Sequence, residues 1–179
     1  MFSLLITSVS WSKDVDYNDL VKKDGLYYEK FTNEPFTGNV FGIRQGKVKK
    51  GKKDGEWIGF HKNGKLFIKQ NYINGKPNGE FLGYWDNGKL QFKNYYKDGK
   101  REGKWLFYRY NGQLSGSMYY KNGKAEGERL SYDKKGFVYQ RSNYKNDKRE
   151  GKVFTYRRNG KLKKTEIYKD GKLIETIKH

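Results

Sequence analysis

The chain has 179 residues, of which 34% are hydrophobic, 17% aromatic and 33% charged, and its formal net charge at pH 7 is +19. The small hydrophobic share excludes a thick aliphatic core, and the high aromatic share argues against a disordered chain. The sequence contains no cysteine, which excludes disulfides, zinc–thiolate sites and thiol nucleophiles.

Residues 1–12 begin with a short apolar run, Phe2 to Val9, that ends in the small-x-small pattern Ser8-Val9-Ser10. This pattern is typical of a signal-peptidase site, so a cleaved segment predicts a periplasmic or secreted protein and an uncleaved one a cytoplasmic protein. The run is too short to span a membrane. Because basic residues are missing before it, a start further upstream and an ordinary N-terminal strand remain open as alternatives.

Residues 13–37 differ from the rest of the chain, since four lysines face six acidic residues over positions 1–37 and the whole basic excess follows them. Asp24-Gly25 lies between two apolar runs and predicts a hairpin. We expect this segment to cap a repeat array, because terminal repeats must be atypical to end a stack. Residues 38–54 are a shortened, degenerate copy of the unit that follows.

Five complete copies of a 24-residue unit fill residues 55–174, with no slip in register. Their first glycines are Gly55, Gly79, Gly103, Gly127 and Gly151. We call the units copy one to copy five, with bounds 55–78, 79–102, 103–126, 127–150 and 151–174. A fixed period of this length indicates a repeat architecture rather than one globular core. Residues 175–179 form the C-terminal end, with no repeat after them.

Each copy carries two turn signals, the first nine residues after its glycine and the second eleven residues later. In copy one they are Asn63-Gly64 and Asn74-Gly75. Asn-Gly between apolar runs predicts a two-residue type I′ hairpin turn, because both central residues need positive φ. The sequence therefore predicts an all-β fold, an elongated single-layer antiparallel β-meander with two strands per copy.

The turn positions also predict the strand register, which places each first glycine opposite a tyrosine. The expected pairs are Gly55 with Tyr72, Gly79 with Tyr96, Gly103 with Tyr120, Gly127 with Tyr144 and Gly151 with Tyr168. A tyrosine ring over a cross-strand glycine would cover bare backbone. One face would carry Trp57, Phe81, Trp105, these tyrosines and the row Leu66, Leu90, Leu114, Val138 and Leu162. The other face would carry Phe60, Tyr84, Tyr108, Tyr132 and Tyr156.

The pattern GxWxxYxxNGxLxxxxxYKNGKxxG over residues 55–174 resembles the MORN-repeat variant family, and in particular the bacterial YwqK-type toxin-antitoxin antitoxins. The lead-in DGLYYEKFTNEPFTG, Asp24 to Gly38, resembles the same family. The resemblance implies an extended β-meander that acts as a binding or scaffolding surface, and it implies no reaction. Copies four and five depart most from the pattern. The departures are Arg129 and Val153 at the aromatic position, Gly116 and Gln140 in place of Ile68 and Phe92, and Asn146-Asp147 in place of Asn-Gly.

The sequence shows no catalytic constellation, so we predict that the protein is not an enzyme and has no cofactor or metal site. His61 and His179 are the two histidines, and a lone histidine at a strand end is far more often structural than catalytic. The glutamates that recur with the repeat, such as Glu56 and Glu80, favour cross-strand charge pairs over acid/base catalysis. The recurring glycines mark turns and not a phosphate loop, because no helix follows them.

The basic excess leaves several partners open. Lysines interleaved with aromatic rings suit an anionic membrane or polysaccharide surface, or single-stranded nucleic acid. The ratio of 31 lysines to 8 arginines disfavours nucleic acid and favours solubility and protection of sheet edges. We therefore expect a protein partner first, and the resemblance implies that this partner is a toxin. The predicted anchors are Trp57, Phe81, Trp85, Trp105 and Tyr108.

Overall fold

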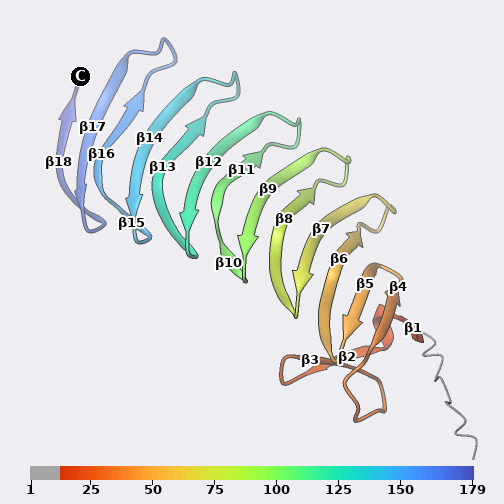
Figure 1. The fold of residues 1–179 in the computed structure, drawn as a ribbon. Helices are drawn as coiled ribbons and strands as arrows, with labels where there is room; N and C mark the ends of the chain where they lie inside the picture. The colour runs from red at the N-terminus through yellow and green to blue at the C-terminus, as the bar shows by residue number, and fades with distance from the viewer. Residues whose placement is uncertain (1–12) are drawn as a thin grey trace, which may run out of the picture.

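The structure, a computed structural model, describes residues 13–179, and the signal-like segment 1–12 lies outside the described residues. It confirms the all-β prediction: a sheet of 16 strands forms a long, curved ribbon, and a separate two-stranded hairpin lies at its N-terminal end (Figure 1). The strands before the first complete copy are β1 (Lys13–Asp16), β2 (Leu20–Lys23), β3 (Leu26–Glu29), β4 (Gly38–Phe41) and β5 (Arg44–Lys49), with the 3-10 turn η1 (Tyr17–Asp19) after β1.

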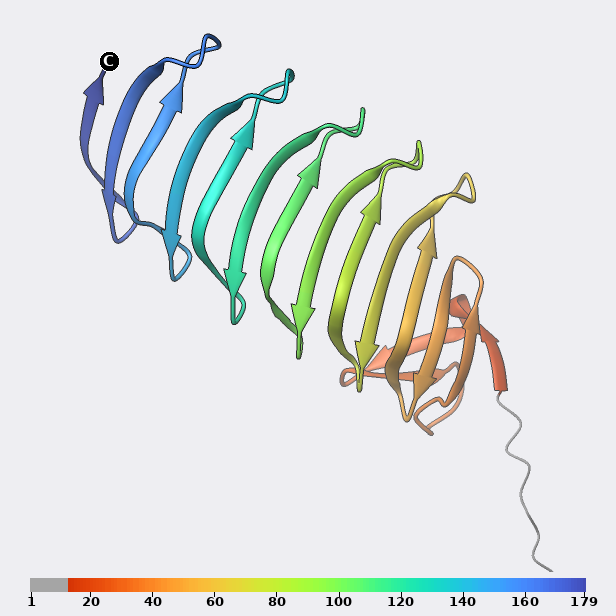
Figure 2. The same cartoon turned by 45° about the horizontal axis from the view of Figure 1, so that its top comes forward.

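The remaining strands follow in pairs along the ribbon. They are β6 (Lys52–Phe60), β7 (Leu66–Ile73), β8 (Lys76–Tyr84), β9 (Leu90–Lys97), β10 (Lys100–Arg101), β11 (Gly103–Tyr108), β12 (Leu114–Lys121), β13 (Lys124–Tyr132), β14 (Val138–Lys145), β15 (Lys148–Arg149), β16 (Gly151–Tyr156), β17 (Leu162–Lys169) and β18 (Lys172–Lys178). Consecutive strands pair antiparallel, so their turns line the two long edges (Figure 2). The exception is β1, which joins β4 in parallel.

The predicted register is confirmed in all five copies. The structure pairs Gly55 with Tyr72, Gly79 with Tyr96, Gly103 with Tyr120, Gly127 with Tyr144 and Gly151 with Tyr168. The expected reason is wrong, because no tyrosine ring covers these glycines: a Cβ at Gly79 would meet only Asn71, at 3.9 Å. Gly79 is needed for its φ of +92°, since the strand bulges there against β7.

The two turns of each copy differ, which corrects the prediction of type I′ geometry at both. The second turn is type I′ as expected, with φ of +49° at Asn74 and +79° at Gly75. At the first turn Gly64 has positive φ but Asn63 does not. Gly64 donates a hydrogen bond to the carbonyl of His61 (2.9 Å), and His61 donates to that of Lys65 (2.8 Å). These bonds define a three-residue loop with a bulge.

The bulge at the first turn moves the leucine row to the other face. Phe60 pairs with Leu66 instead of Phe67, because the register shifts by one residue after Gly59. Directly paired residues of neighbouring strands share a face. The leucine row therefore lies with Phe60 and its equivalents, and not with Trp57 as expected. We call the side of Trp57, Phe81, Trp105 and the five paired tyrosines the tryptophan face, and the other side the leucine face.

The predicted Asp24-Gly25 hairpin is present as β2 and β3. Together with β1, η1 and the following loop it packs on the first strands of the ribbon. The buried cluster there consists of Val15, Phe36, Val40, Val48 and Trp57, with Tyr17, Leu20, Tyr27 and Tyr72 packed against it. This is the thickest part of the molecule, and residues 13–37 act as a lid on the tryptophan face of copy one.

Candidate functional site: the tryptophan face

The structure divides the five predicted anchors among different environments. Trp57, Phe81 and Trp105 share the tryptophan face, where each pairs with a residue of the next strand: Gln70, Asn94 and Met118. Trp85 lies at the start of a first turn, and Tyr108 pairs with Leu114 on the leucine face. Phe81 and Trp105 are therefore the two predicted anchors that share an uncovered surface.

Trp57 is buried under the N-terminal segment, with 3% of its surface exposed. The ring of Tyr27 stacks on the indole and that of Tyr17 meets it edge-on, each with its centroid 6.5 Å away. The indole N–H donates a hydrogen bond to the Lys47 carbonyl (2.9 Å). With its ring covered and its polar atom satisfied, Trp57 has no surface to offer a partner.

Trp105 occupies the same repeat position without a lid. Its indole N–H donates to the Tyr95 carbonyl (3.2 Å), the counterpart of the bond that Trp57 makes. Its ring contacts are lateral, to Tyr96, Phe107 and Tyr120, at centroid distances of 5.4, 6.5 and 4.7 Å. The neighbouring rings leave 8% of Trp105 exposed, while Phe107 beside it is 37% exposed. Trp105 itself is thus largely buried by its neighbours, and the exposed ring beside it in copy three is that of Phe107.

Two arginines stand among the tyrosines of this face. The Arg101 guanidinium lies 4.3 Å from the centroid of the Tyr120 ring and 5.7 Å from that of Trp105. Arg149 donates hydrogen bonds to the hydroxyls of Tyr144 (3.3 Å) and Tyr168 (3.2 Å). Cations held against ring faces gain cation–π energy and keep their charge toward solvent. The uncovered face is therefore both aromatic and cationic.

Tyr144 receives hydrogen bonds from two guanidinium groups, those of Arg149 and Arg129, each at 3.3 Å. Burial raises the pKa of the phenol, but these bonds and the two positive charges outweigh burial, so the pKa lies below its ordinary value. Tyr144 thereby holds Arg129 in place at the border of copies three and four.

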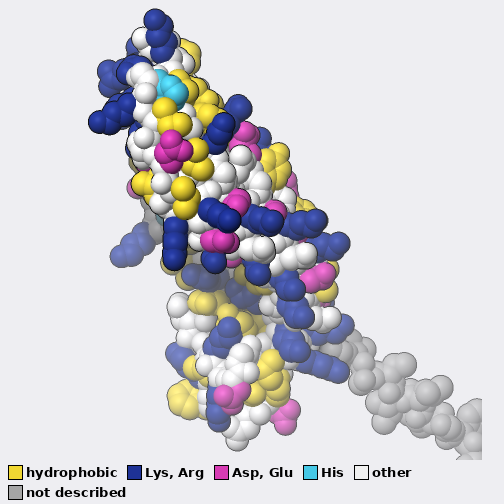
Figure 3. Space-filling model, turned by 90° about the vertical axis from the view of Figure 1, so that its left-hand side faces the viewer, with side chains coloured by type: hydrophobic (Ala, Val, Ile, Leu, Met, Phe, Trp, Pro, Cys, Tyr) yellow, Lys and Arg dark blue, Asp and Glu magenta, His cyan; other side chains and the backbone are white. Residues whose placement is uncertain are grey.

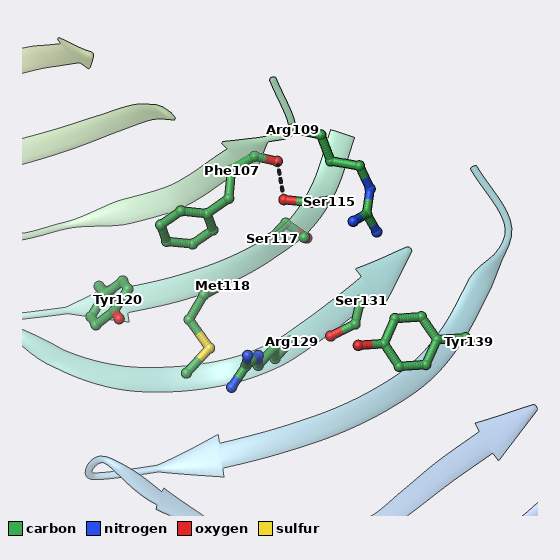
Figure 4. A pocket seen from close by; sticks show the side chains of 10 residues that line it. Phe107, Arg109, Ser115, Ser117, Met118, Tyr120, Arg129, Ser131 and Tyr139 are labelled. Atoms are coloured by element: carbon green, nitrogen blue, oxygen red, sulfur yellow. Dashed lines mark hydrogen bonds between the residues drawn. The ribbon is translucent and has the colours of Figure 1, made fainter. Parts of the chain in front are cut away.

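A pocket of about 470 Å³ opens on this face between copies three and four, and the sequence did not predict it. Phe107, Met118, Arg109, Arg129 and Tyr139 line it together with small residues (Figure 4). The small residues are Ser115, Gly116, Ser117 and Ser131, and Tyr120 completes the wall. The volume falls within the range of ligand-binding pockets. The available signal was the set of departures from the repeat pattern.

Trp85 and Tyr108 lie apart from this surface. The Trp85 ring packs on Tyr110, with centroids 5.9 Å apart, and its buried N–H has no hydrogen-bond partner in the described part of the chain. Tyr108 faces the opposite side of a single-layer sheet. A partner on the tryptophan face would not contact Tyr108.

The two histidines and the recurring glutamates have structural partners. The His61 ring nitrogen lies 2.9 Å from the Tyr84 carbonyl, and that of His179 lies 3.0 Å from the Thr165 hydroxyl. Glu56 and Glu80 form cross-strand ion pairs with Lys69 (2.7 Å) and Lys93 (2.6 Å). Glu102, Glu126 and Glu150 instead accept hydrogen bonds from the backbone of the next type I′ turn.

Residues 13–179 contain no group of three or more acidic or histidine side chains that could hold a metal ion. The same residues include no helix of the length and hydrophobicity that a membrane span requires. What the face offers chemically is recognition: flat rings, guanidinium groups and hydroxyls on a rigid sheet.

Comparison with known proteins gives a family match and a distant structural likeness. The model of the MORN repeat variant matches residues 53–74, 77–98, 101–122 and 149–170. Copies four and five were expected to match weakly. The family model leaves out copy four and matches copy five. No curated protein matches the chain. Among solved structures, the Glycosylation Associate Protein (Gap123) complex from Streptococcus agalactiae matches 64% of this chain and 19% of that chain, with 18% identity and a TM-score of 0.33.

MORN repeats generally form non-catalytic scaffolds, and they commonly mediate protein or membrane interactions. The matched segments each contain one Gly–Tyr pair and the bulged first turn. The family model thus matches four of the five hairpin units of this chain.

Proposed function

We propose that this chain is a non-catalytic scaffold that binds a protein partner through the tryptophan face of copies two to four. The observation that carries the proposal is the lid on copy one. There the chain's own residues 13–37 dock aromatic rings on Trp57 and bury it. The same face continues to Phe81 and Trp105, where the described residues supply no lid.

The lid shows which contacts this face accepts. Tyr27 stacks on the tryptophan, and Val15 and Phe36 fill the space beside it. An apolar and aromatic segment of another protein would meet similar rings at Trp105 and Phe107. Exposed aromatic anchors surrounded by polar groups are the usual energetic centre of a protein interface. The resemblance to YwqK-type antitoxins makes a toxin the partner that we propose.

The proposal is tested by capture of the partner with the folded chain as bait. We choose Phe107→Glu as the main variant, because Phe107 is exposed and its replacement leaves the contacts of Trp105 with Tyr96 and Tyr120 in place. Tyr108→Glu, one residue along on the leucine face, is the matched control. A partner that binds the wild type and the Tyr108→Glu variant but not the Phe107→Glu variant supports the proposal. A partner retained by both variants contradicts it.

A second candidate function is binding to an anionic membrane or envelope polysaccharide. It is favoured by the exposed lysines along the edge of the ribbon that carries the type I′ turns. Five lysine pairs lie directly opposite each other there, although like charges in such positions destabilise a sheet. The pairs are Lys49–Lys52, Lys97–Lys100, Lys121–Lys124, Lys145–Lys148 and Lys169–Lys172. All ten are exposed, and none has an ion pair within the described residues. Dark blue lysine and arginine side chains project from the ribbon in Figure 3.

An anionic surface would offset this repulsion. We expect binding to vesicles of anionic phospholipid to weaken steeply as salt rises, because screening shortens the reach of exposed charges. Lys97→Glu with Lys121→Glu should abolish binding, and Lys134→Glu with Lys161→Glu, near first turns, should not. Absence of vesicle binding at low salt would exclude a membrane as the surface. An envelope location additionally requires cleavage near residue 10, which N-terminal sequencing of the mature protein would detect.

A further inference from the structure

The departures from the repeat pattern in copies three and four meet in one place. Four of them are large changes of side chain, at Arg109, Gly116, Arg129 and Tyr139. The equivalent residues of earlier copies are His61 and Trp85 for Arg109, and Ile68 and Phe92 for Gly116. They are Trp57, Phe81 and Trp105 for Arg129, and Phe67 and Gln91 for Tyr139. All four line the pocket of about 470 Å³ (Figure 4). Positions that break a local rule without a structural reason are those expected to serve function.

The pocket is hollow because Gly116 has no side chain at the position where copies one and two have Ile68 and Phe92. In copy two Phe92 pairs with Gly83, and a Cβ on Gly83 would lie 2.3 Å from the Phe92 ring, so the ring fills this level of the sheet. In copy three the order is reversed, and Phe107 pairs with Gly116. Gly116 pairs in turn with Ser131, so two small residues lie side by side. The space above them is the pocket.

Both guanidinium groups of the pocket are held in position by neutral acceptors. Arg109 donates through Nη2 to the Tyr132 carbonyl (2.5 Å), and Arg129 donates through Nη1 to the Tyr144 hydroxyl (3.3 Å). The buried Nε of Arg109 has no acceptor among residues 13–179. The nearby carboxylate of Glu128 is paired with Arg141 at 3.2 Å. Arginine stays protonated, and none of the residues that line the pocket is acidic, so the pocket lining carries two positive charges.

We propose that this pocket binds a carboxylate joined to an apolar or aromatic group, supplied by an acidic segment of the protein partner. The inference rests on the proposed function and deepens it, because it names the chemistry of the partner at that face. The planar fork of a guanidinium matches a carboxylate with two parallel hydrogen bonds. Phe107, Met118 and Tyr139 offer contacts to the apolar part. The Ser131 hydroxyl can serve as a further donor, whereas that of Ser115 already donates to the Phe107 carbonyl (3.0 Å).

Met118 provides a direct probe of the pocket. The chain has two methionines, Met1 and Met118, so methyl-labelled methionine gives a signal that reports on the pocket wall. We choose phenylacetate as the ligand and phenylacetamide, its neutral counterpart, as the control ligand at equal ionic strength. The Met118 methyl signal should shift saturably with phenylacetate, in the millimolar range expected for so small a ligand, and not with phenylacetamide.

Arg129→Gln removes one charge and keeps most of the side-chain length. It should weaken phenylacetate binding about tenfold or more, the size expected for loss of a charge-assisted hydrogen bond. Arg141→Gln is the matched control, because Arg141 lies on the opposite face and its exposed ion pair contributes little to stability. Equal shifts with acid and amide, no saturable shift, or equal binding by the Arg129→Gln and Arg141→Gln variants would overturn the inference.

Capture of the protein partner by the same two variants shows where the carboxylate comes from. Loss of the partner by Arg129→Gln but not by Arg141→Gln supports an acidic segment of that partner. If Arg129→Gln loses phenylacetate but keeps the partner, the carboxylate belongs to a free small molecule, and the partner is not its source. If the wild type ignores phenylacetate while Phe107→Glu still loses the partner, the inference fails and the proposed function stands.

Discussion

Trp57 and Trp105 occupy the same position of the repeat, 48 residues apart, and their surroundings differ. Both lie on the tryptophan face, and both donate an indole hydrogen bond to a carbonyl ten residues earlier in the chain. Trp57 is covered by the lid and belongs to a buried cluster, whereas among residues 13–179 Trp105 has lateral ring contacts and no lid. The same repeat position is thus covered by the lid in copy one and not in copy three, where we propose the binding surface.

This difference separates the part of the ribbon that the lid stabilises from the part that we propose for binding. In a repeat array each unit contacts its neighbours alone, so a single layer gains little from long-range packing. The lid supplies that packing at the N-terminal end. Within the described residues the lid does not extend over copies two to four, among which the pocket lies.

The largest expected effect is that of Trp57→Ala. Removal of a fully buried tryptophan costs about 3–5 kcal/mol of unfolding free energy, because transfer and cavity terms add. Trp105→Ala should cost clearly less, since water and neighbouring rings can fill part of the space. Hydrogen exchange measured by mass spectrometry should show loss of protection in β4 to β7 for the first variant and in β9 to β13 for the second. Equal losses of protection in the two variants would contradict a special role of the lid in stabilising copy one.

A smaller effect is expected from a matched pair of glycines. Gly51 and Gly103 have φ of +73° and +67°, so alanine is strained at both, by about 1–2 kcal/mol. A Cβ on Gly51 would also lie 2.8 Å from Cβ of Leu26 in the lid, while Gly103 has open space. Gly51→Ala should therefore lower the melting temperature more than Gly103→Ala. If the two variants melt together, the lid is not packed as closely as the structure shows.

The fold was largely predictable because turn chemistry and period leave few alternatives. The Gly79–Tyr96 pair and its four equivalents follow from the spacing of Asn-Gly signals alone. The leucine row was placed on the wrong face because Asn63-Gly64 suits both a two-residue turn and a three-residue loop. The two choices differ by one residue at the strand end, which is enough to move Leu66 to the other face.

The candidate site was predictable only in part. Periodicity marked Trp57, Phe81 and Trp105 as equivalent, but periodicity cannot show that residues 13–37 fold back over one of them. The departures Gly116 and Arg129 were visible in the sequence as weak matches to the pattern. Their meeting with Arg109 and Tyr139 depends on strands that are up to 30 residues apart along the chain. That convergence becomes visible once the strands are placed side by side.

The smallest expected effect is a pH dependence confined to the lidded end. The Lys53 ammonium group lies over the rings of Trp57 (4.0 Å), Tyr72 (5.0 Å) and Tyr27 (5.9 Å). Burial, aided by the positive charges of Arg44 and Lys22, lowers its pKa from 10.5 to about 8. Burial likewise raises the pKa of Tyr27 from 10.0 to about 12, with Tyr17 adding to the shift through its charge and a hydrogen bond.

Between pH 8 and 10 the unfolded chain keeps a proton on Lys53 that the folded chain has released, so the lidded end should become more stable as pH rises. Above pH 10 the unfolded chain loses the Tyr27 proton that the folded chain retains, so stability should fall again. Urea unfolding can be followed by the fluorescence of Trp57 in a variant whose other three tryptophans are phenylalanine. Lys53→Met should abolish the rise in stability and keep the fall. Lys104→Met, in copy three and away from the lid, should change neither. A rise that survives Lys53→Met would mean that another group at the lidded end carries it.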